Sequence, residues 1–366
     1  MQRGNIDKVF LGTTILLLVV GIFVFSSASL GVLAKSEAKF YSIVFNQIIL
    51  GVTFGVLSLI IFSKFNYRFF RKYSFIIFVF AVTVTALVFI PDFGFEHNGA
   101  RRWIEIGSFS FQPSEFLKIG FVFYFAALLS IAKEKVRSFR YGILPFLILI
   151  SICGVLLIKQ PDTGTLMVIF VAGLAMLWVG GTRIRNIITL GLLSVVGVGI
   201  LALIKPYLKA RIMTYLNPAL DPLGASYQLQ QSLIAIGSGG IFGRGFGQSI
   251  QKFNFLPEPV GDSIFAVMSE EFGFIGGLVL LTLFLIFAFR GLKIANNSND
   301  QFGRLLATGL VILIVFQSLI NIGSMVGILP LVGVPVVFIS HGGTALLFAL
   351  AEVGIILNIS KYAKKI

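Results

Sequence analysis

Long apolar runs recur along the whole chain, and short polar segments separate them. An apolar run of about 20 residues is long enough, as a helix, to cross a bilayer core of about 30 Å. The strands of a membrane barrel would alternate in polarity over about 10 residues, whereas these runs are continuous. The pattern therefore predicts an all-α polytopic membrane protein. We place its ten spans at 9–29, 42–63, 74–91, 114–132, 142–158, 164–181, 186–204, 263–290, 303–329 and 341–360.

The composition agrees with a membrane protein and narrows the class of partner. Of the 366 residues, 57% are hydrophobic and only 12% are charged, whereas soluble proteins carry about 25% charged residues. The net charge of +14 would suit nucleic acid, but the basic residues lie in short loops, where membrane topology places them. We therefore expect no nucleic-acid partner. The single cysteine, Cys153, excludes a disulfide within the chain.

The basic residues predict the orientation in the membrane. An even number of spans puts both termini on one side. Most lysines and arginines lie at the termini and in the loops 64–73, 133–141, 182–185 and 291–304. The positive-inside rule therefore places both termini in the cytoplasm.

We expect the chain to form a single domain, 1–366, with two structured outer segments. The large fourth outer loop, 205–262, should contain short helices at the membrane interface, because a structureless loop of that length is unusual. A short hairpin should precede span four, because Trp103, Glu105 and Gly107 alternate along the chain.

Charged residues at the start of span four do not suit lipid. Glu115 falls in the first turn of a helix that starts near Pro113, where the helix dipole favours an acid. Lys118 opposes that dipole and shares the helix face of Glu115. Two interpretations stay open for Lys118. It is a buried ion-pair partner or snorkelling lysine, or it awaits an anionic ligand such as phosphate together with Arg101 or Arg102.

The densest acidic cluster lies at the mouth of span eight. Prolines and a glycine hold Glu258 and Asp262 there. Asp262 could be the N-cap of the helix, or a general base in a polar, partly dehydrated cleft. Glu270 and Glu271 should lie about 12 Å deeper. They point in different directions, so at least one of them should face the helix bundle or a polar cavity.

Two further segments break apolar runs at the outer surface. Taken alone, the segment 160–164 (Gln-Pro-Asp-Thr-Gly), which contains Asp162, is an ordinary turn. The segment 329–344 carries Pro and Gly as in broken helices that line cavities, and its freed N–H groups could bind an anion. A lone histidine is more often a packing residue than a ligand. The candidates in this second segment are Ser340, His341, Gly342 and Gly343.

The polar candidates map to one side of the membrane, which predicts a single site that opens outward. The sequence has no HExxH motif and too few histidines and cysteines for a zinc site, and no phosphate loop for ATP hydrolysis. The residues that map to the outer half are Arg101, Arg102, Glu115, Lys118, Asp162, Glu258, Asp262 and Ser340.

Five motifs, in this order along the chain, resemble the SEDS family (shape, elongation, division and sporulation). The 251–259 run is closer to the division-type FtsW branch than to RodA. The motifs are Asn-Gly-Ala-Arg-Arg-Trp (98–103), Gln-Pro-Ser-Glu-Phe-Leu-Lys (112–118), Gln-Pro-Asp-Thr-Gly (160–164), Leu-Pro-Glu-Pro…Asp-Ser-Ile-Phe-Ala-Val…Glu-Glu-Phe-Gly (256–273) and Ile-Ser-His-Gly-Gly-Thr (339–344).

The resemblance implies a peptidoglycan glycosyltransferase in the bacterial cytoplasmic membrane. Such enzymes polymerise lipid II outside that membrane and work with a class B penicillin-binding protein. The family's essential aspartate falls on Asp262, its motif glutamate on Glu258 and its arginine on Arg102, and its paired acid and lysine fall on Glu115 and Lys118. A divalent cation, Mg or Mn, is left open as a cofactor.

Two motifs depart from the usual family pattern. Many members read His-Thr-Asp where this chain has Val260-Gly261-Asp262, and Ser-Tyr-Gly-Gly-Ser-Ser where it has residues 340–345. The aspartate and the double glycine remain in place. The departures therefore concern fine substrate preference more than activity.

Two functions from different classes stay in competition. In the first, Asp262 activates an acceptor hydroxyl, and Arg102 and Lys118 stabilise the leaving diphosphate. In the second, the protein is a flippase that carries lipid II across the bilayer, which suits charges inside the membrane. Glu352, in span ten toward the cytoplasm, fits the enzyme less well. Polar groups through the full bilayer depth would favour the flippase.

Overall fold

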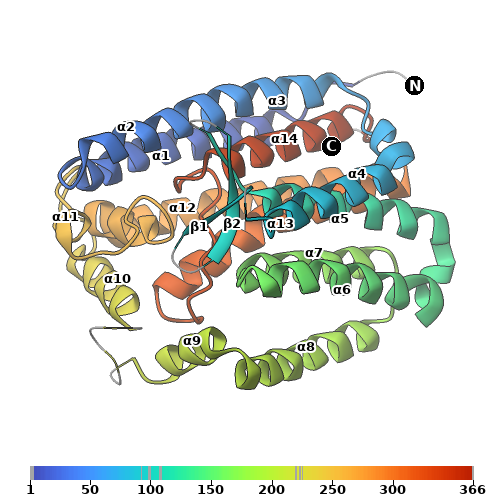
Figure 1. Cartoon of the computed structure of the whole chain (residues 1–366). Coiled ribbons are helices and arrows are strands. Elements are labelled where there is room, and N and C mark those ends of the chain that lie inside the picture. The colour runs from blue at the N-terminus through green and yellow to red at the C-terminus, as the bar shows by residue number, and fades with distance from the viewer. Residues whose placement is uncertain are drawn as a thin grey trace.

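The computed structural model describes residues 4–91, 93–97, 100–106, 109–218, 221, 224 and 226–364, and they form a helical bundle (Figure 1). Within this part of the chain, nine helical segments are long and apolar enough to cross a membrane, and the 17-residue helix α7 is the tenth predicted span. The spans are α1 (Lys8–Leu33), α2 (Glu37–Phe45) continued by the π-helical η1 (Asn46–Thr53) and α3 (Phe54–Lys64), α4 (Arg68–Leu87), α5 (Pro113–Ala132), α6 (Leu144–Lys159), α7 (Thr163–Val179), α8 (Ile184–Ile204), α12 (Ile264–Asn296), α13 (Gln301–Met325) and α14 (Gly343–Ser360).

Burial divides the spans into a central group and a peripheral group. The centre is α13, which packs against α5, α7, α12 and α14. In α13 and α14 more than four-fifths of the apolar window is buried, against 11% in α8. Buried α13 and exposed α8 are both apolar on nearly every side, so the sequence pattern does not separate central from peripheral spans.

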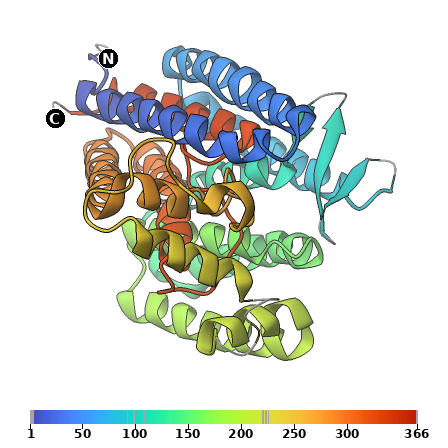
Figure 2. The ribbon, with the colours of Figure 1, turned by 90° about the vertical axis from the view of Figure 1, so that its left-hand side faces the viewer.

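The two termini lie together at one end of the bundle (Figures 1 and 2). The Gly4 N–H donates a 2.9 Å hydrogen bond to the carbonyl oxygen of Lys361. Adjacent termini agree with the even number of spans predicted above. The cytoplasmic location of that end remains a prediction from the basic loops.

The two expected outer segments are structured. In the large fourth outer loop lie the short helices α9 (Pro206–Leu216), α10 (Tyr227–Ser238) and α11 (Gln251–Asn254). Before α5, the strands β1 (Gly94–His97), β2 (Ala100–Ile106) and β3 (Phe109–Phe111) form an antiparallel sheet of order β1-β2-β3. The predicted hairpin is confirmed, although its turns at Asn98–Gly99 and at Gly107 lie outside the described residues. On the other side, η2 (Lys133–Arg137) and η3 (Phe139–Ile143) connect α5 to α6.

Helix α12 is broken at Gly273, where φ is 65° and ψ is −163°. All residues from Ile264 to Glu271 are buried, whereas large exposed side chains begin at Phe274. The part after the break has 23 residues, which at about 1.5 Å per residue span the bilayer alone. The first two turns of α12 therefore precede the membrane crossing.

Glu270 and Glu271 lie at the end of the short helical part of α12 that precedes the break. Glu271 contacts Ser27, which lies 19 residues, or about 28 Å, along α1 from Lys8. Both residues precede the break, so the helix rise from Asp262 to the pair is unaffected by Gly273. The contact with Ser27 places Glu271 beside the C-terminal third of α1. Both side chains are buried, so the expectation that at least one faces the bundle is confirmed.

Candidate active site

Asp262 lies in the turn just before α12. Ser263 occupies the N-cap position of this helix, and no side chain caps it. Of the two alternatives left open for Asp262, the structure excludes the N-cap. Within the described part of the chain, its carboxylate has no hydrogen bond or ion pair, whereas its backbone carbonyl accepts a 2.9 Å bond from Asn321. Asp262 as a whole residue is partly exposed.

Arg211, on α9, approaches Asp262 beside Gly333. A Cβ atom added at Gly333 would lie 3.2 Å from a guanidinium nitrogen of Arg211 and 3.6 Å from a carboxylate oxygen of Asp262. Burial, helped by the negative charge of Glu258, raises the pKa of Asp262 to about 6, and the charges of Arg211 and Arg102 partly oppose this rise. An aspartate with a pKa near neutrality is suited to exchange protons.

Glu258 lies at the rim of the site. It is exposed and has a φ of 47° between two prolines. Its carbonyl oxygen accepts the N–H groups of Gly261 (3.1 Å) and Ser263 (3.2 Å). These bonds form the tight turn that presents Asp262.

Arg101 and Arg102 lie on β2 and are partly exposed. The Arg102 guanidinium donates from Nε to the Gln160 carbonyl at 3.0 Å, and also donates to the Pro161 carbonyl. Arg102 therefore ties the sheet to the turn between α6 and α7, and it brings a positive charge toward Asp262. Arg101 pairs in register with Glu96 of β1.

Asp162 lies in the predicted turn and also caps the helix that follows it, a role that the turn motif did not predict. It is buried and caps α7, since its carboxylate accepts the Thr165 N–H and the Ser114 hydroxyl, each at 3.2 Å. These bonds explain the buried position of Asp162 without any contact between its carboxylate and a substrate. Its negative charge still raises the pKa of Asp262.

Glu115 and Lys118 form a buried ion pair, with 2.8 Å between nitrogen and oxygen. The Lys118 ammonium also donates to the side chain of Gln317 on α13. These side chains and Glu352 line a cavity of about the size of one water molecule. Of the two interpretations left open for Lys118, the structure shows the ion pair, and binding of an anion would require it to exchange partners.

The segment 340–343 is held by internal hydrogen bonds. The Ser340 hydroxyl accepts the Val336 N–H at 2.9 Å. The His341 N–H donates to the Val260 carbonyl at 2.7 Å, and the Gly342 N–H donates to Gln47 at 3.0 Å. The N–H groups of His341 and Gly342 are therefore engaged within the protein rather than free for an anion. Gly343 begins α14 against the Asn46 carbonyl.

His341 itself packs near Phe25, with the ring centroids 6.3 Å apart. Burial, and then the charge of Lys39, lower its pKa to about 4. A neutral histidine in an aromatic contact is a packing residue, as expected for a lone histidine. Through its backbone bond to Val260, it also holds the turn that carries Asp262.

Sequence reasoning missed Arg211 and Asn321. Arg211 also donates a 3.0 Å bond to the Val332 carbonyl. Asn321 donates to the carbonyls of Asp262 and Val334. A weak signal for Arg211 was present, because it is a basic residue in an outer loop, against the positive-inside bias. No pattern marks Asn321, which stands in an apolar span.

The described side chains around Asp262 offer few ligands for a metal ion. Among the described residues, no group of three or more His, Cys, Asp and Glu side chains could hold a metal ion. A magnesium ion is commonly held by one or two carboxylates together with substrate phosphates. Asp262 and Glu258 could supply such carboxylates, so the divalent cation remains an expectation.

The fold and this site define a polytopic α-helical membrane protein, in which charged side chains gather around Asp262. The chain belongs to the FtsW/RodA/SpoVE family of cell cycle proteins, whose family model matches residues 7–365. This membership confirms the SEDS resemblance.

Individual relatives are similar along nearly their whole length. Stage V sporulation protein E of Bacillus subtilis (strain 168) is 39% identical over 364 residues, 99% of each chain. The probable peptidoglycan glycosyltransferase FtsW of Geobacter sulfurreducens is 36% identical, over 98% of this chain and 96% of its own. An FtsW-like branch therefore stays a prediction.

Solved structures share the fold. One chain, from a study of how a peptidoglycan synthase complex coordinates polymerization and crosslinking, is 24% identical with a TM-score of 0.79, over 97% of both chains. The rod shape determining protein RodA of Thermus thermophilus is 23% identical with a TM-score of 0.68, over 98% of both chains.

Proposed function

We propose that this protein is a peptidoglycan glycosyltransferase that polymerises lipid II into glycan strands at the outer face of the cytoplasmic membrane. The observation that carries the proposal is the Asp262 carboxylate, which has no hydrogen-bond partner in the described chain and has Arg102 and Arg211 nearby. Similarity to relatives named as glycosyltransferases supports it.

Asp262 is the general base in this proposal. It takes the proton from the 4-hydroxyl of an acceptor N-acetylglucosamine, and the resulting oxygen attacks the anomeric carbon of the donor. The bond from that carbon to the diphosphate breaks, and undecaprenyl diphosphate leaves. With a pKa of about 6, Asp262 is mostly ionised at neutral pH and still basic enough to accept a proton.

Arg102 and Arg211 are the cations that bind the leaving diphosphate. Both lie near Asp262 and both carry planar guanidinium groups, which match phosphate oxygens in pairs. Fixed cations are most effective where charge develops during the reaction. Lys118 contributes less directly, because Glu115 and Gln317 already engage it.

A class B penicillin-binding protein is the proposed partner. The support is the similarity in fold to a chain from a peptidoglycan synthase complex that couples polymerization to crosslinking. A partner that cross-links the product would act where the glycan strand leaves the site, on the outer side.

Purified protein in detergent, supplied with lipid II, should produce glycan strands that a gel resolves by length. The flippase alternative has one observation in its favour, the polar cluster of Lys118, Gln317 and Glu352 inside the bundle. Liposomes with labelled lipid II test it. Transfer of lipid II between leaflets without any glycan product would overturn the proposal.

A further inference from the structure

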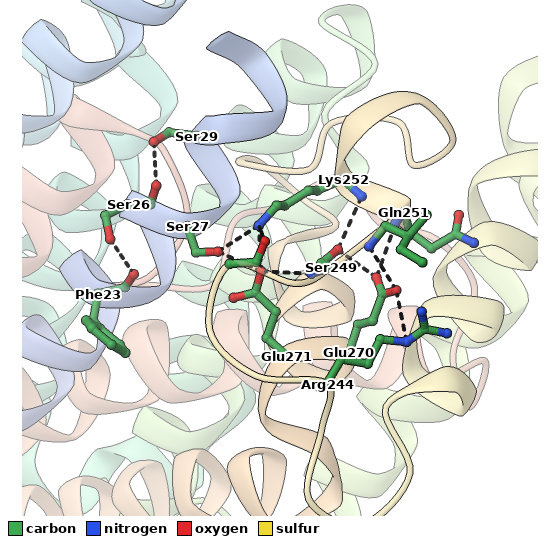
Figure 3. A network of polar contacts seen from close by, with 12 residues as sticks. Phe23, Ser26, Ser27, Ser29, Arg244, Ser249, Gln251, Lys252, Glu270 and Glu271 are labelled. Atoms are coloured by element: carbon green, nitrogen blue, oxygen red, sulfur yellow. Dashed lines mark hydrogen bonds and ion pairs between the residues drawn. The ribbon is translucent and has the colours of Figure 1, made fainter. Parts of the chain in front are cut away.

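The buried carboxylates of Glu270 and Glu271 bind the part of the outer loop that precedes Asp262 in the chain (Figure 3). We call the cluster of these two side chains with Ser27, Ser249 and Lys252 the clamp. Glu270 accepts the Ser249 hydroxyl at 2.6 Å and the N–H groups of Ile250 at 3.1 Å and Gln251 at 3.3 Å. Half-exposed Arg244 lies 3.6 Å from the same carboxylate. A single side chain of α12 therefore binds three successive residues of the outer loop.

Glu271 binds the next residue of that loop and a different helix. It lies 2.7 Å from the Lys252 ammonium, in an ion pair that is completely buried. It also accepts the Ser27 hydroxyl of α1 at 2.6 Å and the Ser249 N–H at 3.3 Å. Lys252 in turn donates to Ser27 at 2.9 Å. The outer loop, α12 and α1 thus meet at one buried ion pair.

The break at Gly273 strengthens the same junction through the backbone. The carbonyls of Glu270 and Glu271 accept the N–H groups of Arg244 and Gly245, each at 3.0 Å. Beyond the break, the Phe274 N–H donates to the Gly240 carbonyl at 2.9 Å. Backbone groups that a helix break would leave bare are therefore satisfied by the loop.

The residues between these anchors form a closed loop with Asp262 inside it. The chain leaves Lys252 and enters α12 at Ile264, six residues after Glu258. Glu270 and Glu271 lie further along the same helix. Away from the clamp, the loop is attached by the bond of His341 to Val260 and of Asn321 to Asp262. The clamp fixes the end of the loop that these two bonds do not reach.

We propose that Glu270 and Glu271 are positioning residues for the glycosyl transfer. They do not touch substrate, but they hold the loop so that Asp262 meets the acceptor hydroxyl. This inference rests on the proposed function. A displacement of about 1 Å of a catalytic group can lower turnover by about 100-fold, so a looser clamp should lower kcat without a matching rise in KM.

Gly31 allows the clamp to be disturbed without removing a charge. A Cβ atom at Gly31 of α1 would lie 2.9 Å from the carbonyl carbon of Lys252 and 3.3 Å from its Cβ, so Gly31→Ala pushes the clamp away from α1. Gly12, also in α1, has open space at that position and supplies the matched control, Gly12→Ala.

Gly31→Ala, Glu270→Gln and Glu271→Gln should each lower kcat about 10-fold or more, with KM for lipid II little changed and Gly12→Ala like the wild type. The double variant Glu271→Gln/Lys252→Met removes both charges of the ion pair. It should recover thermal stability while kcat stays low, because the neutral pair no longer pins the loop.

The proposal is overturned if turnover follows the folded fraction in every variant, or if the double variant regains kcat together with stability. Either result would make the clamp a purely structural element. A wild type that binds lipid II but never polymerises it would instead overturn the proposed function. The kcat of each variant is therefore compared with that of a wild type that polymerises lipid II in the same assay.

Discussion

Asn321 of α13 donates one side-chain amide to two backbone carbonyls, that of Asp262 at 2.9 Å and that of Val334 at 2.6 Å. A single buried amide thus joins the central helix, the turn before α12 and the segment before α14. Asp262 lies 59 residues before Asn321, whereas Val334 lies 13 residues after it. Their meeting point sets where the Asp262 backbone lies.

Replacing this amide should disturb both stability and turnover. Asn321→Leu leaves two carbonyls without a donor, at a cost of about 1–3 kcal/mol for each, and Asn321→Asp should be worse because a carboxylate repels them. Thermal unfolding and glycan synthesis measure the two effects. Ser324→Ala, which removes only a bond to the Asn321 carbonyl within the same helix, is the control. Normal turnover in Asn321→Asp would contradict this role.

Asp262→Asn and Asp262→Ala should both lose at least about 100-fold in glycan synthesis while the protein stays folded, as expected when a general base is removed. Lipid II binding, measured separately, should persist. Recovery of synthesis at high lipid II or metal concentration would point to binding rather than proton transfer. Near-normal glycan synthesis by Asp262→Asn would show that Asp262 is not the general base.

Turnover should rise with pH through about 6, the pKa of Asp262, because the base acts in its ionised form. The positive charge of Arg211 lowers that pKa, so Arg211→Gln should move the midpoint of the pH profile upward. Arg211→Lys should keep the midpoint. Lys209→Gln, at an exposed residue of the same helix, is the matched control. An unchanged midpoint in Arg211→Gln would contradict this assignment.

The same raised pKa has a consequence for stability. Folding disfavours the ionised form of Asp262, so the cost is absent below pH about 4, grows as the pH rises toward 6 and is complete above it. Asp262→Asn should therefore be more stable than the wild type at pH 7 and equally stable at pH 4.

Lys118→Met should destabilise the protein by about 3–5 kcal/mol, because it leaves the buried Glu115 carboxylate without its partner. The double variant Lys118→Met/Glu115→Gln removes both charges and should recover most of that loss. Turnover that returns with folding marks a structural ion pair. A folded double variant that fails to use lipid II would instead indicate that Lys118 binds the diphosphate of lipid II.

The orientation can be checked by thiol labelling of intact cells after Cys153→Ala. A cysteine at exposed Asn254, in the large outer loop, should react with a membrane-impermeant reagent. A cysteine at exposed Lys135, in the loop after α5, should not react. The opposite pattern would place the Asp262 site in the cytoplasm.

The candidate site was partly visible in the sequence, because charged residues in apolar surroundings are rare enough to be examined one by one. Asp262, Glu258 and Arg102 were found this way. Roles were harder to predict than positions. Asp162 is a helix cap and Lys118 is an ion-pair partner, since each role depends on an atom supplied by a different helix.

The sequence by itself determined that the chain is a bundle of membrane-spanning helices and roughly where each one lies, because each apolar run meets the length of the bilayer independently of its neighbours. Tertiary structure alone decided that Gly273 divides α12, that Arg211 reaches Asp262, and that the clamp at Glu271 joins Ser27, 244 residues away. Hydropathy measures the transfer of one segment from water to lipid. It carries no information about which distant partner will satisfy a buried charge.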